Sequence, residues 1–255
     1  MLAANPETAW ALRLNYAGRY EAELTSLVDR GTGNGGSRLQ DIYFTLDALG
    51  EPGRLFHPMC GTGRWASALR ERGATSLYFG LDISEQSITL ARSRVLTATT
   101  FKVGDVLDHW PQEAREADTA IWTFEALNYF PPKIAASLIR RIADMPAIQR
   151  VLIDLAWPFP PAGLGLRARV ARAHPVGAGL GVEICCRRPV RGPQTGLTDT
   201  IAVLSRKGPR VIHSTLWQHT PDFFGSILSR SRFVEVQRII TPSQTTLLIH
   251  ERRAS

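Results

Sequence analysis

From Arg54 to Leu155 the sequence alternates between short apolar runs and segments with helical periodicity. The expected strands are Arg54–Cys60, Ser76–Asp82, Phe101–Val103, Thr119–Thr123 and Arg150–Leu155, and the expected helices are Arg64–Arg72, Glu85–Leu96 and Pro132–Ala143. Strands that are separated by helices pair in parallel through right-handed crossovers. This region therefore predicts an α/β fold, in which a doubly wound, Rossmann-like sheet is covered by helices on both faces.

The flanking segments follow other patterns. Residues 7–30 and 37–49 predict two helices joined by a flexible glycine-rich loop, Gly31–Gly36. Three strand-like runs without intervening helices predict an antiparallel meander: Val182–Arg187, Thr198–Arg206 and Arg210–His219. A helix at Pro221–Arg230 precedes a hairpin of Phe233–Ile240 and Thr245–Glu251. We expect an N-terminal helical lid (1–50), a core (51–157), an antiparallel insertion (158–220), and a last helix and hairpin that complete the core sheet (221–255).

Composition excludes several classes of protein. The 255 residues are 44% apolar, but their apolar runs fall well short of the roughly 20 residues of a membrane-spanning helix. The three cysteines are an odd number, and Cys185 adjoins Cys186, so a disulfide scaffold is not expected. No Cys/His spacing resembles a zinc site, and we expect no metal. The start of the chain lacks the pattern of a secretory signal, so we expect a cytoplasmic globular protein.

Charge is unevenly distributed along the chain. Residues 1–128 hold 12 Lys/Arg and 16 Asp/Glu, a net charge of −4, whereas residues 129–255 hold 18 and 7, a net charge of +11. Of the 30 basic residues, 27 are Arg, which is typical of a high-GC genome and also of a surface that meets an anionic partner. The arginines are scattered, with few aromatic residues between them. We therefore do not expect nucleic acid as a partner.

A glycine turn, His57–Arg64, lies between the first expected strand and its helix. Gly61 and Gly63 allow a sharp backbone turn and the close approach of a ligand. Asp82 and Asp105 follow at the ends of the second and third strands, where the ligand crevice of such a sheet lies. Each feature has a plainer interpretation: an ordinary strand-to-helix turn, a helix N-cap at Asp82 and a turn acid at Asp105. Their order and near-equal spacing favour a nucleoside site.

These motifs resemble those of class I S-adenosylmethionine-dependent methyltransferases of the small-molecule type. The resemblance rests on the turn 57–64, on Gly80–Ser84, Gly104–Val106 and Phe124–Tyr129, and it is clear from about Arg54 to Leu155. It implies S-adenosyl-L-methionine as the cofactor, held by nine residues. These are Tyr20, Cys60, Gly61, Gly63, Asp82, Ile83, Asp105, Val106 and Phe124.

The resemblance also assigns positions to parts of the cofactor. The glycine turn would lie under its methionine part, and Asp82 would hold the ribose. Ile83 would pack on the adenine, and Asp105 with Val106 would meet the adenine amino group. The segment Thr123–Asn128 would border the reactive methyl.

Two positions depart from the family pattern. His57 stands where the family has Asp or Glu, an acid that helps to hold the methionine ammonium, and Met59 stands for the first glycine of the usual triplet. A neutral imidazole could replace the acid, whereas an imidazolium would repel the ammonium.

The glycine turn also fits a dinucleotide fingerprint. Gly61-x-Gly63-x-x-Ala66 followed by Asp82 matches the pattern of NAD-binding folds. Hydride enzymes of that type usually need a positioned Lys, a Tyr-Lys pair or a His-acid pair near the nicotinamide. The chain has only three Lys and no Tyr-x-x-x-Lys motif, so we favour the methyltransferase.

Candidate catalytic residues lie in three segments. Tyr16 and Tyr20 share a face of the first helix, which folds over the cofactor in the family, or they pack on the core. Glu125 follows the fourth strand, near the methyl, or is a solvated helix-start acid. His219 shares strand parity with His213 and Trp217 and could act as a base, or this face of the sheet is packed or solvated.

We expect a methyltransferase that acts on a small-molecule acceptor through O, N or C, as in bacterial specialised metabolism. The alternatives are an RNA or protein methyltransferase, which the basic C-terminal half favours, and a non-catalytic S-adenosylmethionine-binding relative. The expected partner is a compact acceptor, with anionic acceptors included, bound by a monomer or homodimer, with no membrane.

Overall fold

The computed structural model describes residues 35–94, 97–108, 110–124, 126–155, 167–176, 179–189, 196–205, 208–242 and 245–254. The chain divides into two compact units. One consists of Gly36–Pro160 with Gln218–Ser255, and the other of Met1–Gly35 with Pro161–Trp217. Among the described residues, no helix has the length and apolar character needed to cross a bilayer.

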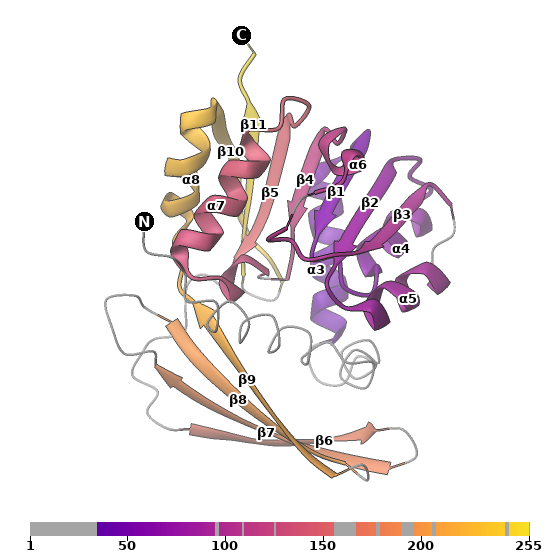
Figure 1. Cartoon of the computed structure of the whole chain (residues 1–255), viewed down its shortest axis with the longest axis vertical. Coiled ribbons are helices and arrows are strands. Elements are labelled where there is room, and N and C mark those ends of the chain that lie inside the picture. Colours follow the sequence, from indigo (N-terminus) through magenta and orange to yellow (C-terminus); the bar gives the residue numbers. More distant parts are fainter. Residues whose placement is uncertain are drawn as a thin grey trace. The chain divides into compact units, whose positions relative to one another are not determined.

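The first unit contains a seven-stranded sheet in the order β10-β11-β5-β4-β1-β2-β3 (Figure 1). Its strands are β1 (Arg54–Pro58), β2 (Leu77–Asp82), β3 (Thr99–Val103), β4 (Thr119–Trp122), β5 (Arg150–Leu155), β10 (Phe233–Ile240) and β11 (Thr246–Arg252). Strands β1 to β5 pair in parallel, and β11 is antiparallel to both β5 and β10. This arrangement confirms the predicted α/β class, with its mostly parallel sheet and antiparallel hairpin. The strand order reverses between β1 and β4, which makes their shared carboxyl edge the natural ligand crevice.

The helices of this unit follow local sequence signals. They are α3 (Gly35–Leu49), α4 (Arg64–Glu71), α5 (Glu85–Arg94), α6 (Gln112–Arg115), α7 (Pro132–Ala143) and α8 (Pro221–Leu228), with the 3₁₀ turns η1 (Ala126–Tyr129) and η2 (Ser229–Ser231). Helix α7 begins with Pro132, whose fixed φ suits a first helical position. Helix α8 is capped by Thr220, whose hydroxyl accepts the Phe223 N–H at 3.2 Å.

The start of α3 corrects one prediction. We expected Gly35 and Gly36 in a flexible loop, but both lie in the first turn of the helix. The first N–H groups of a helix need no intrahelical partner, so glycine interferes less there than in a helix interior.

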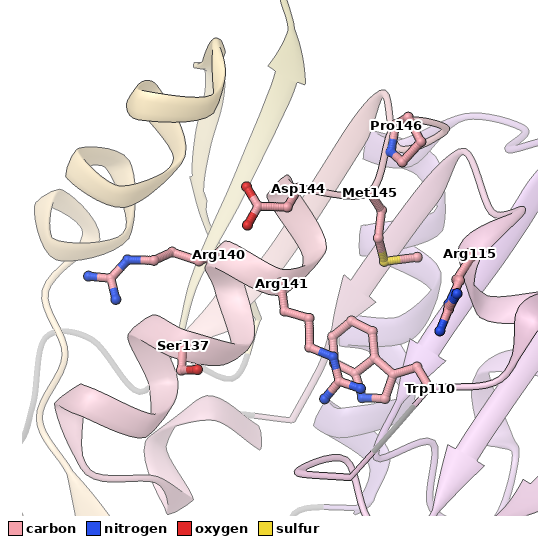
Figure 2. A pocket seen from close by; sticks show the side chains of 8 residues that line it. All are labelled: Trp110, Arg115, Ser137, Arg140, Arg141, Asp144, Met145 and Pro146. Carbon is pink, nitrogen blue, oxygen red and sulfur yellow. The ribbon is translucent and has the colours of Figure 1, made fainter. Parts of the chain in front are cut away.

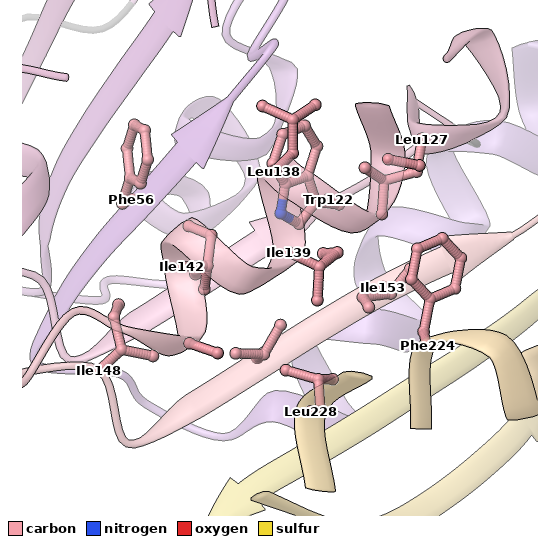
Figure 3. Close-up of a cluster of buried hydrophobic side chains, with 14 of the residues drawn as sticks. Phe56, Trp122, Leu127, Leu138, Ile139, Ile142, Ile148, Ile153, Phe224 and Leu228 are labelled. Atoms are coloured by element: carbon pink, nitrogen blue, oxygen red, sulfur yellow. The ribbon is translucent and has the colours of Figure 1, made fainter. Parts of the chain in front are cut away.

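Two apolar clusters cover the two faces of the sheet. Figure 3 shows the cluster in which Phe56, Trp122 and Ile153 of the strands meet α7 and α8. On the other face, Leu55 and Leu152 pack with residues of α3, α4 and α5. Successive residues of a strand point to opposite faces, so both faces of the central strands are buried, as in a doubly wound fold.

The second unit contains an antiparallel sheet in the order β6-β7-β8-β9. Its strands are β6 (Arg167–Val176), β7 (Gly179–Pro189), β8 (Gly196–Ser205) and β9 (Gly208–Trp217). The meander was predicted with three strands, and β6 was missed. Three arginines and Pro175 interrupt its alternation of apolar residues, so the segment lacks a clear strand pattern.

Candidate functional site

The turn between β1 and α4 depends on two glycines with left-handed backbone. Gly61 has φ +56° and Gly63 has φ +72°. A Cβ on Gly63 would lie 2.9 Å from the Cβ of Ala91, which is closer than real contacts allow. A Cβ on Gly61 would have no atom within 4 Å, so the space over this residue is open. Gly63 therefore packs tightly against α5, whereas the space over Gly61 is accessible.

Asp82, at the end of β2, fixes this turn. Its Oδ2 accepts the Gly61 N–H at 2.8 Å, and its Oδ1 accepts the Ser84 N–H at 2.9 Å. The side chain is only 3% exposed. Burial raises the pKa of Asp82 to about 6, although hydrogen bonds from the N–H groups of Ser84, Gly61 and Ile83 act to lower it. The hydrogen bonds to this carboxylate therefore do not fully compensate for the solvent that it loses on burial.

The surroundings of Asp82 fit a ribose. An ionised carboxylate has about four acceptor positions, and the three backbone N–H groups leave one for a hydroxyl donor. The half-buried Ile83 follows it with an apolar side chain of the kind that packs on a base. The open space over Gly61 adjoins the same carboxylate. The residues present are therefore able to hold a nucleoside.

The remaining predicted cofactor residues of the described region lie at the same carboxyl edge. Cys60 is buried, donates its N–H to Leu81 O at 3.0 Å and has a pKa raised by burial, so its backbone, not its thiol, shapes the turn. Asp105 Oδ1 accepts the Leu107 N–H at 2.8 Å in the turn after β3. Val106 is buried, and its carbonyl accepts the Trp110 indole N–H at 2.7 Å.

His57 lies inside the sheet, 1% exposed, between two hydroxyl groups. Its Nδ1 is 2.6 Å from the Tyr78 hydroxyl and its Nε2 is 2.9 Å from Thr123 Oγ1. A neutral imidazole has one donor and one acceptor nitrogen, and two hydroxyls satisfy both. Burial lowers the pKa of His57 to about 3, so the ring is neutral at physiological pH. His57 thus links β1 to β2 and to the loop after β4 without adding charge.

A further carboxylate that sequence analysis missed lies at the end of β5. Asp154 Oδ2 accepts the Phe124 N–H at 2.9 Å, and its Oδ1 accepts the Thr245 hydroxyl at 2.6 Å. Phe124 has φ +55°, a left-handed conformation that is costly for a residue with a Cβ. A signal was present in the sequence, because Asp154 is the one charged residue within the apolar run Val151–Leu155.

The Phe124 ring faces the glycine turn. The guanidinium of Arg64, the first residue of α4, lies 5.1 Å from the centre of this ring. This distance is within the range of a cation–π contact. The loop after β4 and the helix after β1 therefore meet across the point where the strand order reverses.

His219 is not on a strand, which corrects the prediction that it continues the face of His213 and Trp217. Strand β9 ends at Trp217, since Thr220 and Pro221 begin α8. The His219 ring is buried and stacks on Phe223, with ring centres 5.4 Å apart. Its Nε2 lies 3.1 Å from the O of Leu127, within η1, and 3.0 Å from the O of Phe130, the residue that follows η1. Burial lowers its pKa, which favours a neutral ring that donates to these carbonyls.

Several predicted residues lie beyond this description. Tyr16, Tyr20 and Glu125 are outside the described residues, and for His213 only the backbone of β9 is described. Within the described ranges, no group of three His, Cys, Asp or Glu side chains could hold a metal ion.

A hollow of about 560 Å³ lies at the other edge of the sheet (Figure 2). It is lined by Trp110 and Arg115, which precede β4, and by Arg140, Arg141 and Asp144, which precede β5. In Figure 2 the Arg141 guanidinium lies over the Trp110 ring, 4.1 Å from its centre. This hollow is at the amino ends of the strands and contains none of the predicted site residues.

Residues 58–146 match the family model of a methyltransferase domain. No curated protein sequence matches the chain.

Solved structures are similar over nearly the whole chain. DesVI from Streptomyces venezuelae is 19% identical, with a TM-score of 0.67 over 92% of this chain and 100% of its own. The sugar N-methyltransferase KedS8 from a Streptoalloteichus species is 17% identical, with a TM-score of 0.63 over 90% and 92%. The amino pentose methyltransferase CalS10 from Micromonospora echinaspora, solved with S-adenosylmethionine, is 14% identical, with a TM-score of 0.59 over 99% and 98%. At these identities the likeness shows a shared fold.

Proposed function

We propose that this chain transfers the methyl group of S-adenosylmethionine to a small-molecule acceptor, because residues 58–146 match a methyltransferase domain model and solved methyltransferases share its fold. The observation that carries the proposal is the buried Asp82 carboxylate at the end of β2. It accepts the Gly61 N–H, adjoins the open space over this glycine and retains capacity for a hydroxyl donor.

The proposed cofactor site follows the carboxyl edge from β3 to β4. Gly61, Gly63 and the backbone of Cys60 would lie under the methionine part, and Asp82 would accept from a ribose hydroxyl. The other proposed cofactor contacts are Ile83, Asp105, Val106, Phe124 and Tyr20. Phe124 supports this assignment because its half-buried ring faces α4 at the end of the glycine turn.

The bound cofactor supplies an electrophilic methyl on a sulfonium, so the chain needs no covalent nucleophile. Its own residues must hold an acceptor in line with the methyl and exclude water. The neutral His57 contributes here by adding no positive charge beside the cationic methionine end. It also ties β1 to the loop after β4 through Thr123, which keeps the two sides of the crevice in register.

For contact with the reacting groups and proton removal from the acceptor, we propose fewer residues than the sequence predicted. Tyr16, Tyr20 and Glu125 remain our proposals for contacts with the reacting groups. For His219 we propose a structural role instead of a base. Its Nε2 lies against the carbonyls of Leu127, within η1, and Phe130, just after it, so this histidine holds the segment after β4 in place.

Amines are the first acceptors to test. Two structural neighbours are a sugar N-methyltransferase and an amino pentose methyltransferase, and we propose the same kind of acceptor, a small amino sugar, for this chain. The amine would lose a proton on methylation, which a carboxylate or phenolate near the methyl would accept.

The test combines binding with turnover. Calorimetry should show binding of S-adenosylmethionine and of S-adenosylhomocysteine by the full chain. Mass spectrometry with a labelled methyl donor should then show transfer to a member of a panel of amino sugars, hydroxylated small molecules, RNA and basic peptides. Transfer to RNA or peptide alone would overturn the small-molecule assignment. Binding without transfer to any class would favour a non-catalytic relative.

A further inference from the structure

The loop that follows β4 begins with a strained residue. Phe124 has φ +55°, a region that residues with a Cβ rarely adopt because the Cβ crowds the backbone. Single residues in such conformations persist only where the surrounding structure holds them in place. The strain is located at the carboxyl end of β4, where the proposed cofactor meets the loop.

The group that holds this residue is the Asp154 carboxylate. It is 6% exposed, and its Oδ2 accepts the Phe124 N–H at 2.9 Å. The carboxylate is itself oriented by Thr245, which immediately precedes β11 and whose hydroxyl donates to Oδ1 at 2.6 Å. Thr245 in turn lies 2.8 Å, between hydroxyl oxygens, from Thr241 on the other side of the β10–β11 turn.

The Phe124 side chain is the part that reaches the proposed site. Its half-buried ring lies with its centre 5.1 Å from the Arg64 guanidinium. A peptide that returned to the usual φ would swing this ring away from α4, because φ sets the direction of the Cα–Cβ bond relative to the preceding strand. The carboxylate on β5 therefore controls the position of the Phe124 ring in the loop after β4.

We propose that Asp154 is a positioning residue for the cofactor: it clamps Phe124 in the left-handed conformation and so places the Phe124 ring as one wall of the cofactor site. This inference rests on the proposed function, because it assumes that the cofactor lies at this edge. Thr245 completes the clamp by fixing the orientation of the carboxylate.

The experiment measures the affinity for S-adenosylhomocysteine by calorimetry and the thermal stability of each variant. Asp154→Ala should weaken binding about tenfold or more, the scale of a backbone N–H left without its acceptor. Asp154→Asn keeps an oxygen that can accept the Phe124 N–H, so its affinity should stay within about threefold of the wild type.

A pair of threonine variants provides a matched control. Thr245→Val should weaken binding about threefold, since the carboxylate loses its orienting donor. Thr119→Val removes a similar bond, from a buried hydroxyl to Asp118 Oδ1 at 2.7 Å, at the amino end of β4. It should lower stability to a similar extent and leave the affinity unchanged. If Asp154→Ala does not fold, the difference in affinity between Thr245→Val and Thr119→Val tests the inference in its place.

The Phe124→Gly background separates positioning from general structural damage. Glycine adopts a positive φ without help and has no ring to place. Asp154→Ala should therefore change the affinity less than about twofold in this background, although it changes it tenfold in the wild type. Equal effects in both backgrounds would overturn the inference, as would equal effects of the two threonine variants. If the wild-type chain itself binds neither cofactor form, the proposed function fails; if it binds and Asp154→Ala binds equally well, only the clamp is wrong.

Discussion

The β1–β2 and β4–β5 halves of the crevice are built on the same plan. In each half, a buried aspartate at the end of the outer strand accepts a backbone N–H from the loop after the inner strand. Asp82 accepts from Gly61, with φ +56°, and Asp154 accepts from Phe124, with φ +55°. The two left-handed residues thus lie in the loops that follow β1 and β4, the adjacent strands at the reversal of strand order.

The two halves differ in what the left-handed residue brings. Glycine adopts this conformation without strain and leaves open space above it, whereas phenylalanine is strained and contributes a ring. The second oxygen of Asp82 is bound locally by Ser84, but that of Asp154 is bound by Thr245 of a distant hairpin. In the proposed site, one half therefore leaves room for the cofactor, and the other supplies a wall for it.

The link between the halves should produce the largest effect, as a loss of stability in acid. His57 has a folded pKa of about 3 against an unfolded value of 6.5, so the unfolded chain binds the extra proton and stability falls as pH decreases from 6.5 toward 3. The full loss is roughly 5 kcal/mol at the lower end. Denaturant unfolding at a series of pH values measures it.

Two variants isolate the contribution of His57 to the pH dependence of stability. His57→Asn keeps a donor and an acceptor but does not titrate, so its stability should depend less on pH across this window; an unchanged slope would contradict the assignment. Asp82 acts with the opposite sign, because its raised pKa makes the folded chain bind the proton and stability falls as pH rises from 3.8 to 6. Measuring His57→Asn in an Asp82→Asn background removes that opposing contribution.

The next largest effect is a loss of cofactor affinity when the β1–β2 half of the crevice is altered. Asp82→Ala should weaken S-adenosylmethionine binding by about 1–3 kcal/mol, because a ribose hydroxyl loses its acceptor and the Gly61 N–H loses its partner. Calorimetry gives the value directly. The affinity of Thr119→Val serves as the reference for damage at the opposite edge. An affinity of Asp82→Ala equal to that of the wild type would remove the ribose assignment.

Gly61→Ala tests the difference between the two left-handed residues. The added Cβ has room but must adopt φ +56°, so we expect the chain to lose about 1–2 kcal/mol of folding stability. The methyl would also occupy the space left for the ligand and should weaken cofactor binding. Gly50→Ala, at φ +70° and likewise without a neighbour within 4 Å, is the matched control and should lose stability alone. Unchanged cofactor binding by Gly61→Ala would mean that the open space is not used.

The smallest effect is a pH dependence of binding. Hydroxyl donors favour the ionised form of Asp82, so affinity should fall as pH decreases through about 6. The limit is about tenfold per pH unit, or 1.4 kcal/mol. Calorimetry between about pH 5 and 8, within the usual range of protein stability, measures this pH dependence. The control is Asp82→Asn, which should bind weakly at all of these pH values. A wild-type affinity that is flat across pH 6 would show that this carboxylate does not ionise with binding.

The sequence predicted the region from β1 to β5 well because its signals are local. Asp82 and the glycine turn could be placed together, since β1 and β2 are consecutive parallel strands whose ends meet. The contact of Asp154 with Thr245 could not, because it spans 91 residues and depends on β11 lying beside β5. The role of His57 was also hidden, since its partners come from other parts of the sheet: Tyr78 from β2 and Thr123 from the loop after β4. Strand β6 was missed because its arginines mask the alternation.

The position of β11 between β5 and β10 has a consequence for synthesis on the ribosome. Until Thr246–Arg252 emerges, the buried strand β5 presents a free edge to the nascent chain and to its neighbours. Such an edge can pair wrongly or recruit other polypeptides, and chaperones bind exposed apolar surface of this kind. The crevice of a growing polypeptide is therefore incomplete until β11 is inserted beside β5.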